Sequence, residues 1–185
     1  IMDARWYHDP VYCEGALLNM KDNQGDDGLY PCILVDNTLH SYANFIGWAT
    51  YQFYLIHRDK NFIETMLPSL KKQVYGERNK LKSRNDELLV EYNHNLTGKE
   101  YQPSYWYFHA YPDDCSDKTK YTPLKRVDRA IYHYLNLMGT WTLCKEIGDV
   151  GENEIITIAG QLRDDILNKM WDKETNFFYD LHYEN

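Results

Sequence analysis

The sequence predicts an all-α fold of tandem αα-hairpins that stack into a larger ring or solenoid. Three observations support this fold class. Apolar residues recur at helical spacing in several long segments, these segments pair across short charged turns, and the pattern of helix, turn and helix occurs twice. Because one hairpin cannot bury its apolar face alone, neighbouring hairpins are expected to pack together.

The N-terminal half contains the first three expected helices. Asp9 supplies a cap and Pro10 a first-turn proline for a helix from Val11 to about Asn23. Loop-forming residues follow from 24 to 31. A second helix is expected from about His40 to His57. After a turn at 58–60, a third helix carries an apolar stripe formed by Phe62, Ile63, Met66, Leu67, Leu70 and Val74.

The helical period is lost between about residues 80 and 122. This segment is rich in tyrosine and is interrupted by Gly98, Pro103 and Pro112. Structureless loops of such length are uncommon, and the aromatic content disfavours disorder. The segment is therefore expected to be one long ordered loop that holds short strands.

Two further helices are expected in the C-terminal half, from Asp128 to Ile147 with Gly148 as the C-terminal cap, and from Gly151 to Trp171. Trp171 and the Phe177-Phe178 pair are interpreted as core residues at the helix end. The face of the first helix expected to point inward is apolar and comprises Ile131, Tyr134, Leu135, Met138, Trp141 and Ile147. The corresponding face of the last helix comprises Ile155, Ile158, Ala159, Leu162, Ile166, Leu167 and Met170.

Composition excludes several classes of function. The net charge of −8 provides no basic patch, which argues against nucleic acid as a partner. No apolar stretch reaches the roughly 20 residues of a membrane span. The four cysteines lack the spacing of a zinc site, and Asp26 and Asp27 lack the remaining ligands of a calcium loop. Neither a metal nor a cofactor is expected. The abundance of Tyr and Trp suits sugar rings as well as helix packing.

Five stretches of the chain carry a resemblance to a known group of proteins. They are residues 5–10, 24–31, 97–104, the pair 127–130 and 146–148, and 170–180. In this order the chain resembles inverting glycoside hydrolases of the trehalase, mannosylglycerate hydrolase and processing α-glucosidase type. The resemblance implies an (α/α)6 toroid. Since this chain begins at Ile1 and supplies less than half of such a ring, residues 1–185 are expected to be one incomplete toroid domain from the N-terminal part of the catalytic domain.

The resemblance also implies the site residues. The 97–104 loop of these families presents a general acid, usually Asp, and Glu100 takes that place here. Partial desolvation among neighbouring aromatic side chains could keep its proton bound, whereas a solvated salt bridge is the alternative. The catalytic base is expected outside this chain. The other residues expected to bind an oligosaccharide or glycoside substrate are Arg5, Trp6, Asp9, Tyr101, Trp106 and Asp128, with helix capping as the alternative for Asp9 and Asp128.

Three functions remain open on the sequence. The leading hypothesis is an inverting hydrolase that acts on oligosaccharides or from a chain end, with Glu100 as its acid. An αα-toroid epimerase or lyase would use His or Tyr as its base. A non-catalytic helical scaffold would bind carbohydrate or protein through the aromatic loop. Replacement of Glu100 by Gln distinguishes them, because only the hydrolase needs that carboxyl group.

Overall fold

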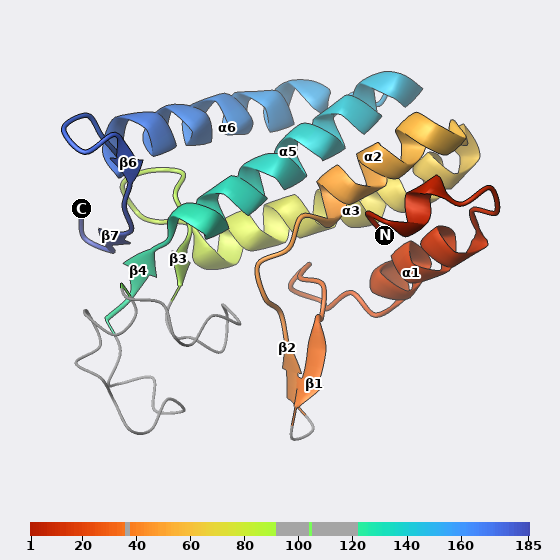
Figure 1. Cartoon of the computed structure of the whole chain (residues 1–185), viewed down its shortest axis with the longest axis horizontal. Coiled ribbons are helices and arrows are strands. Elements are labelled where there is room, and N and C mark those ends of the chain that lie inside the picture. Colours follow the sequence, from red (N-terminus) through yellow and green to blue (C-terminus); the bar gives the residue numbers. More distant parts are fainter. Residues whose placement is uncertain (36–37, 92–103, 105–121) are drawn as a thin grey trace.

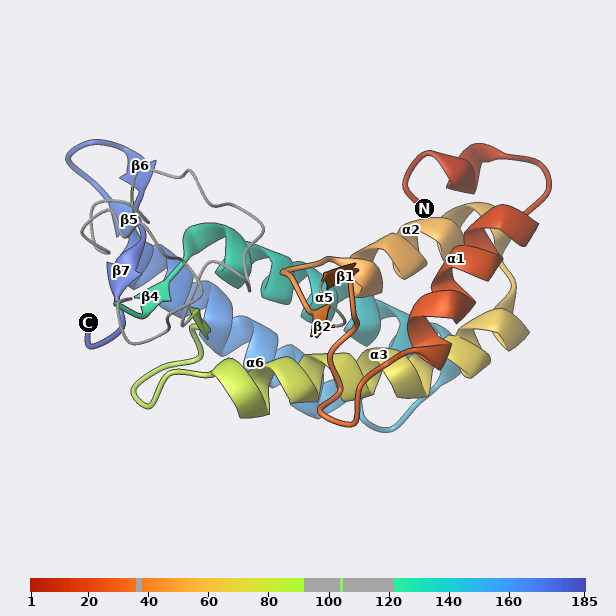
Figure 2. The ribbon, with the colours of Figure 1, turned by 90° about the horizontal axis from the view of Figure 1, so that it is seen from below.

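The structure is a computed structural model that describes residues 1–35, 38–91, 104 and 122–185. In this part of the chain, helix α5 lies at the centre and packs against α2, α3 and α6, while α1 covers the far ends of α2 and α3 (Figures 1 and 2). The helices are α1 (Val11–Asp22), α2 (Ile46–His57), α3 (Lys60–Leu81), α5 (Val127–Ile147) and α6 (Glu152–Asp165). The two expected hairpins, α2 with α3 and α5 with α6, are confirmed.

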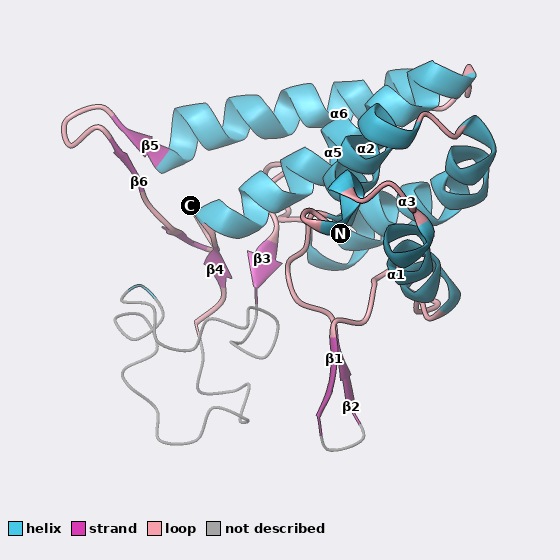
Figure 3. Cartoon of the chain, turned by 45° about the vertical axis from the view of Figure 1, so that its right-hand side comes forward, coloured by secondary structure: helices cyan, strands magenta, loops and turns pink. Residues whose placement is uncertain are grey.

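Short strands accompany the helices. The strands β1 (Ile33–Val35) and β2 (Thr38–His40) form an antiparallel hairpin with Leu34 opposite Leu39. A second sheet has the order β3 (Val90–Glu91), β4 (Leu124–Lys125) and β7 (Leu181–His182). The last pair is β5 (Trp171–Asp172) with β6 (Phe177–Phe178). Figure 3 shows the β1–β2 hairpin and strands β3 and β4 on the same side of the helices.

Two boundaries differ from expectation. The second helix begins at Ile46 rather than near His40, because residues 38–40 pair with 33–35 as strand β2. The side chain of Asn44 then accepts a hydrogen bond of 3.3 Å from the Ile46 N–H and so marks the start of the helix. The last helix changes at Ile166 into a π-helical turn, η4 (Ile166–Met170), before strand β5 begins.

The inward face of α5 coincides only in part with the apolar face that the sequence suggested, since Tyr134, Met138, Trp141 and Ile147 pack against the core. Ile131 is 38% exposed, and Tyr134, Met138 and Trp141 are only partly buried. The buried positions include both apolar and polar residues: Arg129, Ala130, His133, Asn136, Leu137, Gly139, Thr140, Leu143 and Cys144. The sequence pattern missed the polar members of this face, because hydrophobic periodicity does not detect a polar side chain that is buried with partners.

Two other residues expected in the core are largely solvent-exposed. Leu167 is 49% exposed and Phe177 is 63% exposed, whereas Trp171 packs edge to face with Phe178 across the β5–β6 pair. Alternation along a strand explains the second difference, since Phe177 and Phe178 point to opposite faces.

Glycine allows two close backbone approaches in the helical core. A Cβ atom on Gly139 of α5 would lie 2.4 Å from the carbonyl oxygen of Gly47 in α2. The loop after α1 approaches α3 in the same way, because a Cβ atom on Gly76 would lie 2.2 Å from the carbonyl oxygen of Asp27. These contacts bring the helix axes and the 24–31 loop nearer than larger residues allow.

The 24–31 loop is fixed on α3 by buried polar contacts of Tyr30 and by an exposed ion pair of Asp27. The Tyr30 hydroxyl lies 2.7 Å from the Ser69 hydroxyl, and the Tyr30 N–H donates to the side chain of Gln73 at 2.9 Å. Asp27 accepts from the Leu29 N–H and from Lys80 at 2.6 Å. Asp27 therefore serves to hold the loop.

None of the described helices combines the length and the apolar composition that a membrane crossing requires.

Candidate functional site

Strands β3 and β4, which flank residues 92–121 in the sequence, lie beside the first turn of α5. Strand β3 ends just before this segment, strand β4 begins just after it, and the two strands pair in an antiparallel ladder that we call the stem. Helix α5 starts two residues after β4. The expected acid Glu100 and the expected sugar-binding residues Tyr101 and Trp106 fall between the two strands and lie outside the described residues.

A carboxylate from the C-terminal segment holds the start of α5. Asp180, which follows β6, accepts a hydrogen bond of 2.9 Å from the Val127 N–H through Oδ1 and one of 2.5 Å from the Ser104 hydroxyl through Oδ2. Nη1 of Arg126 lies 3.6 Å from the same Oδ2. An anion here satisfies a helix-terminal N–H and interacts favourably with the helix dipole.

Asp128 lies in the first turn of α5, where the sequence places it. Its Oδ1 accepts a hydrogen bond of 2.7 Å from the Arg129 N–H. The N-cap residue of α5 is Arg126, so Asp128 lies inside the first turn and is not the capping residue. The residue is only partly buried, so its carboxylate lies at the end of α5 next to the stem.

Buried ion pairs connect the stem with α3 and α5. Glu91, the last residue of β3, lies 3.2 Å from Nε of Arg126 and 3.5 Å from Nη1 of Arg129. The other side of the Arg129 guanidinium contacts Oε1 of Glu77 in α3 at 3.3 Å. All four side chains are almost fully shielded from solvent. Each buried charge therefore has a partner of opposite sign, as burial requires.

The same polar network continues from Glu77 to the start of α2. Oε2 of Glu77 lies 2.9 Å from Nδ1 of His133, and the Asn136 amide donates to it at 3.5 Å. Asn136 also donates to the carbonyl oxygen of Asn44 at 2.8 Å and accepts from the Gly47 N–H at 2.9 Å. An unbroken series of contacts thus runs from the N-terminus of α2 through the core to Asp180 and Ser104.

The Glu77 carboxylate is stabilised in its ionised form. Burial alone raises its pKa, but the hydrogen bond from His133 and the charge of Arg129 outweigh burial and hold the pKa below its usual value. A general acid needs a bound proton near neutral pH. Glu77 is therefore suited to holding α3 and α5 together rather than to donating a proton.

A second buried cluster fixes the turn between α3 and β3. Oδ2 of Asp86 lies 2.8 Å from Nζ of Lys125 in β4 and 2.8 Å from Nζ of Lys169 in η4. Lys125 also donates to the carbonyl oxygen of Asn185. Burial raises the pKa of Asp86, and the two ammonium groups lower it by more, so its pKa lies below the usual value. Each strand of the stem therefore contributes to a buried ion pair, β3 through Glu91 and β4 through Lys125.

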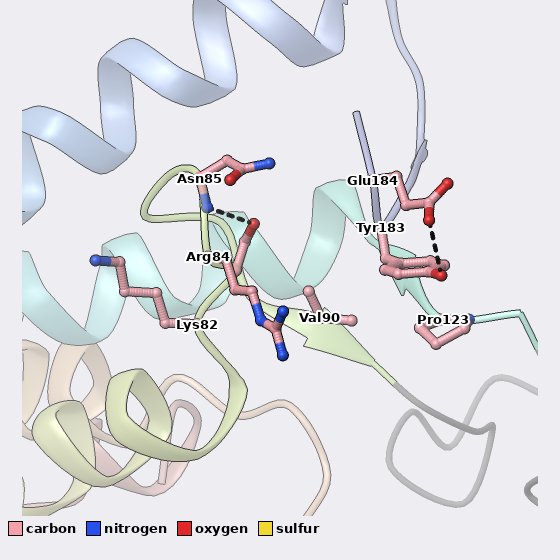
Figure 4. Close-up of a pocket in the computed structure, with 8 residues that line it drawn as sticks. Lys82, Arg84, Asn85, Val90, Pro123, Tyr183 and Glu184 are labelled. Carbon is pink, nitrogen blue, oxygen red and sulfur yellow. Dashed lines mark hydrogen bonds between the residues drawn. The ribbon is translucent and has the colours of Figure 1, made fainter.

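A cavity of about 760 Å³ opens beside the stem. Lys82 and Arg84 line it on one side and Tyr183 and Glu184 on the other, with Val90 between them (Figure 4). Its remaining lining residues are Ser83, Asn85 and Pro123. This volume lies within the range of small-molecule sites. The combination of an aromatic ring, amide and hydroxyl groups and a guanidinium group can bind polar ligands.

Arg5 and Trp6 belong to a short 3-10 helix, η1 (Ala4–Trp6), that packs against α2, and Asp9 lies at the start of α1. The carbonyl oxygen of Arg5 is 2.9 Å from Nε2 of His57, and the Arg5 guanidinium lies 4.8 Å from the centre of the Trp6 ring. Trp6 is 65% exposed. Oδ1 of Asp9 accepts a hydrogen bond of 3.0 Å from the Val11 N–H, which confirms its contact at the start of α1.

This N-terminal group and Asp128 are not brought together. Tyr54, near the end of α2, donates a hydrogen bond to Glu146, near the end of α5. Asp128 and Glu146 lie 146 − 128 = 18 residues apart on α5, which at a rise of about 1.5 Å per residue corresponds to about 27 Å. Among the expected substrate-binding residues that the structure describes, Arg5 therefore lies near one end of α5 and Asp128 lies at the other.

Within the described part of the chain, no group of three or more His, Cys, Asp or Glu side chains is placed to hold a metal ion. Asp26 and Asp27, whose spacing superficially resembles a calcium loop, lie in a loop in which Asp27 is bound to Lys80.

The sequence did not indicate Asp180, Glu77 or Glu91 as parts of this site. Their partners lie 53, 56 and 38 positions away in the sequence. A signal was nevertheless present, since Arg129, His133 and Asn136 recur at helical spacing on one face of α5 and interrupt its apolar pattern. A polar stripe that faces a helical core predicts buried partners from neighbouring elements.

One protein-family model matches the chain over its full length. The mannosylglycerate hydrolase MGH1-like glycoside hydrolase domain matches residues 1–185. No curated protein matches the chain.

Three solved structures are similar in fold. The GH63 mannosylglycerate hydrolase from Thermus thermophilus, in complex with glucose, has a TM-score of 0.76 at 13% identity, over 95% of this chain and 58% of that one. An uncharacterised conserved protein from the same organism has 0.74 at 14% identity, over 91% and 54%. A sialidase has 0.72 at 19% identity, over 96% and 14%. The chain therefore spans less than two thirds of each of these proteins, and at these identities the likeness shows the fold alone.

Proposed function

The chain belongs to the MGH1-like glycoside hydrolase family, and on this premise we propose that it forms the acid-bearing part of an inverting glycosidase. The proposed substrate is an oligosaccharide or another glycoside. Glu100 is the proposed general acid, and the catalytic base comes from a part of the enzyme outside residues 1–185. The observation that carries the proposal is the position of the stem, whose strands β3 and β4 flank residues 92–121 in the sequence and lie beside the first turn of α5.

In the proposed reaction, Glu100 gives its proton to the glycosidic oxygen as the bond to the anomeric carbon breaks. The base removes a proton from a water molecule, which attacks the anomeric carbon from the opposite face of the sugar. A single displacement of this kind inverts the configuration and needs two carboxyl groups about 6.5–9.5 Å apart. The departing sugar leaves with the proton from Glu100, and the water proton remains on the base.

Substrate binding is assigned to residues around the same segment. Tyr101 and Trp106 offer aromatic faces on which sugar rings stack, and the partly buried Asp128 accepts hydrogen bonds from sugar hydroxyls. The cavity beside the stem gives room for additional sugar units. Arg5, Trp6 and Asp9 form a separate binding group at the other end of α5, where the exposed Trp6 ring is available for stacking.

The buried ion pairs support this assignment by their placement. Glu77 and Glu91 bind arginine side chains, and Asp180 binds the start of α5. These carboxylates hold the stem and the helices in place, which removes these three from the candidates for the general acid. Precise positioning of the acid matters because catalytic geometry must be kept within about 0.5 Å.

The test uses the longest natural polypeptide that contains residues 1–185. It is assayed on a panel of α- and β-linked oligosaccharides, and the configuration of the first product is followed by NMR. We expect an inverting activity that Glu100→Gln removes and that Glu174→Gln, a change of an exposed glutamate in the β5–β6 turn, retains.

Other outcomes would contradict the proposal. Full activity in Glu100→Gln would move the acid to another residue, and absence of hydrolysis in the wild-type polypeptide would favour a carbohydrate-binding scaffold or an epimerase. The purified 1–185 chain alone is expected to hydrolyse none of these substrates, because its base is missing. Activity of that chain would overturn the assignment of the base.

A further inference from the structure

Arg84 places a positive charge at the cavity beside the stem. The residue lines the cavity and is exposed, and its guanidinium forms no ion pair with any residue that the structure describes. Other cations near this end of α3 are paired with carboxylates: Arg78 and Lys82 with Glu87, Lys80 with Asp27, and Lys125 with Asp86. An anion that enters the cavity therefore meets an arginine that is available to bind it.

The backbone that carries Arg84 is held in place on both sides. In the turn between α3 and β3, the Ser83 N–H donates to the Leu88 carbonyl oxygen at 2.8 Å, and the Asn85 N–H donates to the Ser83 hydroxyl at 3.3 Å. Asp86 follows in the turn and forms the buried ion pairs described above. When a ligand binds, only the side chain of Arg84 must become ordered, which lowers the entropic cost of binding.

Tyr183 supplies the opposite wall of the cavity. Its N–H donates to the Pro123 carbonyl oxygen at 3.2 Å, and its hydroxyl donates to the Glu184 carboxylate at 3.1 Å, so the ring is held from two directions. Tyr183 is 39% exposed, and Figure 4 shows it across Val90 from Arg84. A partly exposed aromatic face of this kind suits the apolar face of a sugar ring.

The charges of the lining favour a ligand with one negative charge. The lining contains the cations Lys82 and Arg84, and Lys82 already contacts Glu87 at 2.8 Å. Glu184 adds a carboxylate on the opposite side. Among the described residues, this leaves the Arg84 guanidinium to pair with the ligand, and a guanidinium binds a carboxylate through two parallel hydrogen bonds. A phosphate carries a second negative charge that Arg84 does not compensate and that Glu184 repels.

We propose that the cavity beside the stem is a subsite for an acidic sugar, which is a sugar unit with a carboxylate on its ring. The carboxylate pairs with Arg84, and the sugar ring lies against Tyr183. The amide of Asn85, next to Arg84 in the lining, bonds to the sugar hydroxyls. This inference rests on the proposed function and adds to it one class of sugar unit in the substrate, the uronic acids.

The test measures how the longest natural polypeptide that contains residues 1–185 binds three small probes. Methyl glucuronide carries the carboxylate, methyl glucoside is its neutral counterpart, and glucose 6-phosphate carries a doubly charged group. Isothermal titration calorimetry at pH 7 gives the three affinities. Because a hydrogen bond to a charged group changes affinity by about tenfold, we expect methyl glucuronide to bind about tenfold more tightly than methyl glucoside. It should also bind more tightly than glucose 6-phosphate.

Arg84→Gln should remove this preference. The variant is expected to fold, since Arg84 is exposed and forms no ion pair in the described part of the chain. The affinity for methyl glucuronide should fall about tenfold, to that for methyl glucoside. Arg84→Lys keeps the charge but loses the two parallel hydrogen bonds and should give an intermediate affinity. Arg163→Gln is the matched control, because it removes an exposed arginine of α6 that does not line the cavity, and it should retain the preference.

Variants of Tyr183 test the opposite wall. Tyr183→Ala removes the aromatic face and should weaken the binding of methyl glucuronide about fivefold. Tyr183→Phe keeps the ring and should bind as the wild type does. Unchanged affinity in Tyr183→Ala would contradict the placement of the sugar ring.

Absent binding of methyl glucuronide, or binding equal to that of methyl glucoside, would overturn the proposal. Tighter binding of glucose 6-phosphate would do the same, and a preference that survives Arg84→Gln would place the acidic sugar elsewhere. These outcomes are distinct from those for the glycosidase assignment. If the wild-type polypeptide hydrolyses no glycoside, that assignment fails, while the calorimetry still decides whether the cavity binds an acidic sugar.

Discussion

Nδ1 of His133 lies 2.9 Å from Oε2 of Glu77, and this buried contact joins α5 to α3. The second oxygen of Glu77 contacts Arg129 at 3.3 Å, so one carboxylate serves two residues of α5 that are one helical turn apart. These contacts hold α5 against α3, so their loss is expected to weaken the packing of the two helices.

Replacement of Glu77 by Gln should destabilise the protein strongly. The variant leaves the buried Arg129 with less negative charge, and breaking a buried ion pair costs about 3 to 5 kcal/mol. Urea unfolding at pH 7, followed by circular dichroism, measures the change in the free energy of unfolding. Glu64→Gln on the exposed face of the same helix should stay within about 0.5 kcal/mol of the wild type. Equal effects of the two changes would contradict the account of the buried pair.

Acid should destabilise the protein through several carboxylates at once. For Glu87, burial raises the pKa, but the contacts with Arg78 and Lys82 lower it by more, and the net pKa lies below the usual value. Glu77 and Asp86 behave alike. A group with a depressed folded-state pKa contributes stability that is present above its unfolded pKa and is lost as the pH falls through the folded pKa.

The free energy of unfolding is therefore expected to hold between pH 7 and 5 and to fall below about pH 4.3, the ordinary pKa of Glu. Urea unfolding at a series of pH values measures this dependence. Glu87→Gln should be less stable than the wild type at pH 7 and should lose less on acidification. Parallel curves for the two proteins would show that Glu87 is not part of the effect.

Gly139→Ala should force α2 and α5 apart. The added Cβ would lie 2.4 Å from the carbonyl oxygen of Gly47, and the backbone cannot yield as a flexible side chain can. Overpacking of this kind costs about 1 to 3 kcal/mol. Gly160→Ala in α6 is the matched control, because nothing lies within 4 Å of its added Cβ. That change should raise stability by about 0.5 to 1 kcal/mol through better helix propensity.

Asp86→Asn should loosen the turn before the stem. The variant leaves the fully buried Lys125 without its carboxylate partner and also removes the contact of Lys169. A loss of about 3 to 5 kcal/mol in the free energy of unfolding is expected from thermal or urea denaturation. Asp22→Asn breaks an exposed pair with Lys21 at 2.9 Å and should cost less than about 1 kcal/mol. A small effect at Asp86 would indicate that water reaches this cluster.

The helical architecture could be predicted from the sequence because apolar periodicity records which faces are buried. The stripe from Phe62 to Val74 identified α3, and its residues are buried as expected. Gly148, with φ of 73°, ends α5 in the left-handed conformation that glycine favours.

The polar part of the site could not be predicted in the same way. His133 and Asn136 are as deeply buried as Leu137, yet hydropathy assigns them to the surface. Their burial depends on Glu77 in another helix, and one sequence contains no direct record of such pairing. The start of α2 was predicted too early for a related reason. Residues 38–40 pair with residues 33–35 in a β-hairpin, and a helical pattern in the sequence does not reveal such pairing.

The stem of β3 and β4 allows the segment between its strands to vary in length. Its two strands bring residues 91 and 124 side by side before the chain enters α5, so the separation of these anchor points is independent of the number of residues between them. Each doubling of loop length costs only about 0.6 kcal/mol in closure entropy. Insertions, deletions or whole exchanges between these anchors are therefore expected to leave the sequence requirements of the helical frame unchanged.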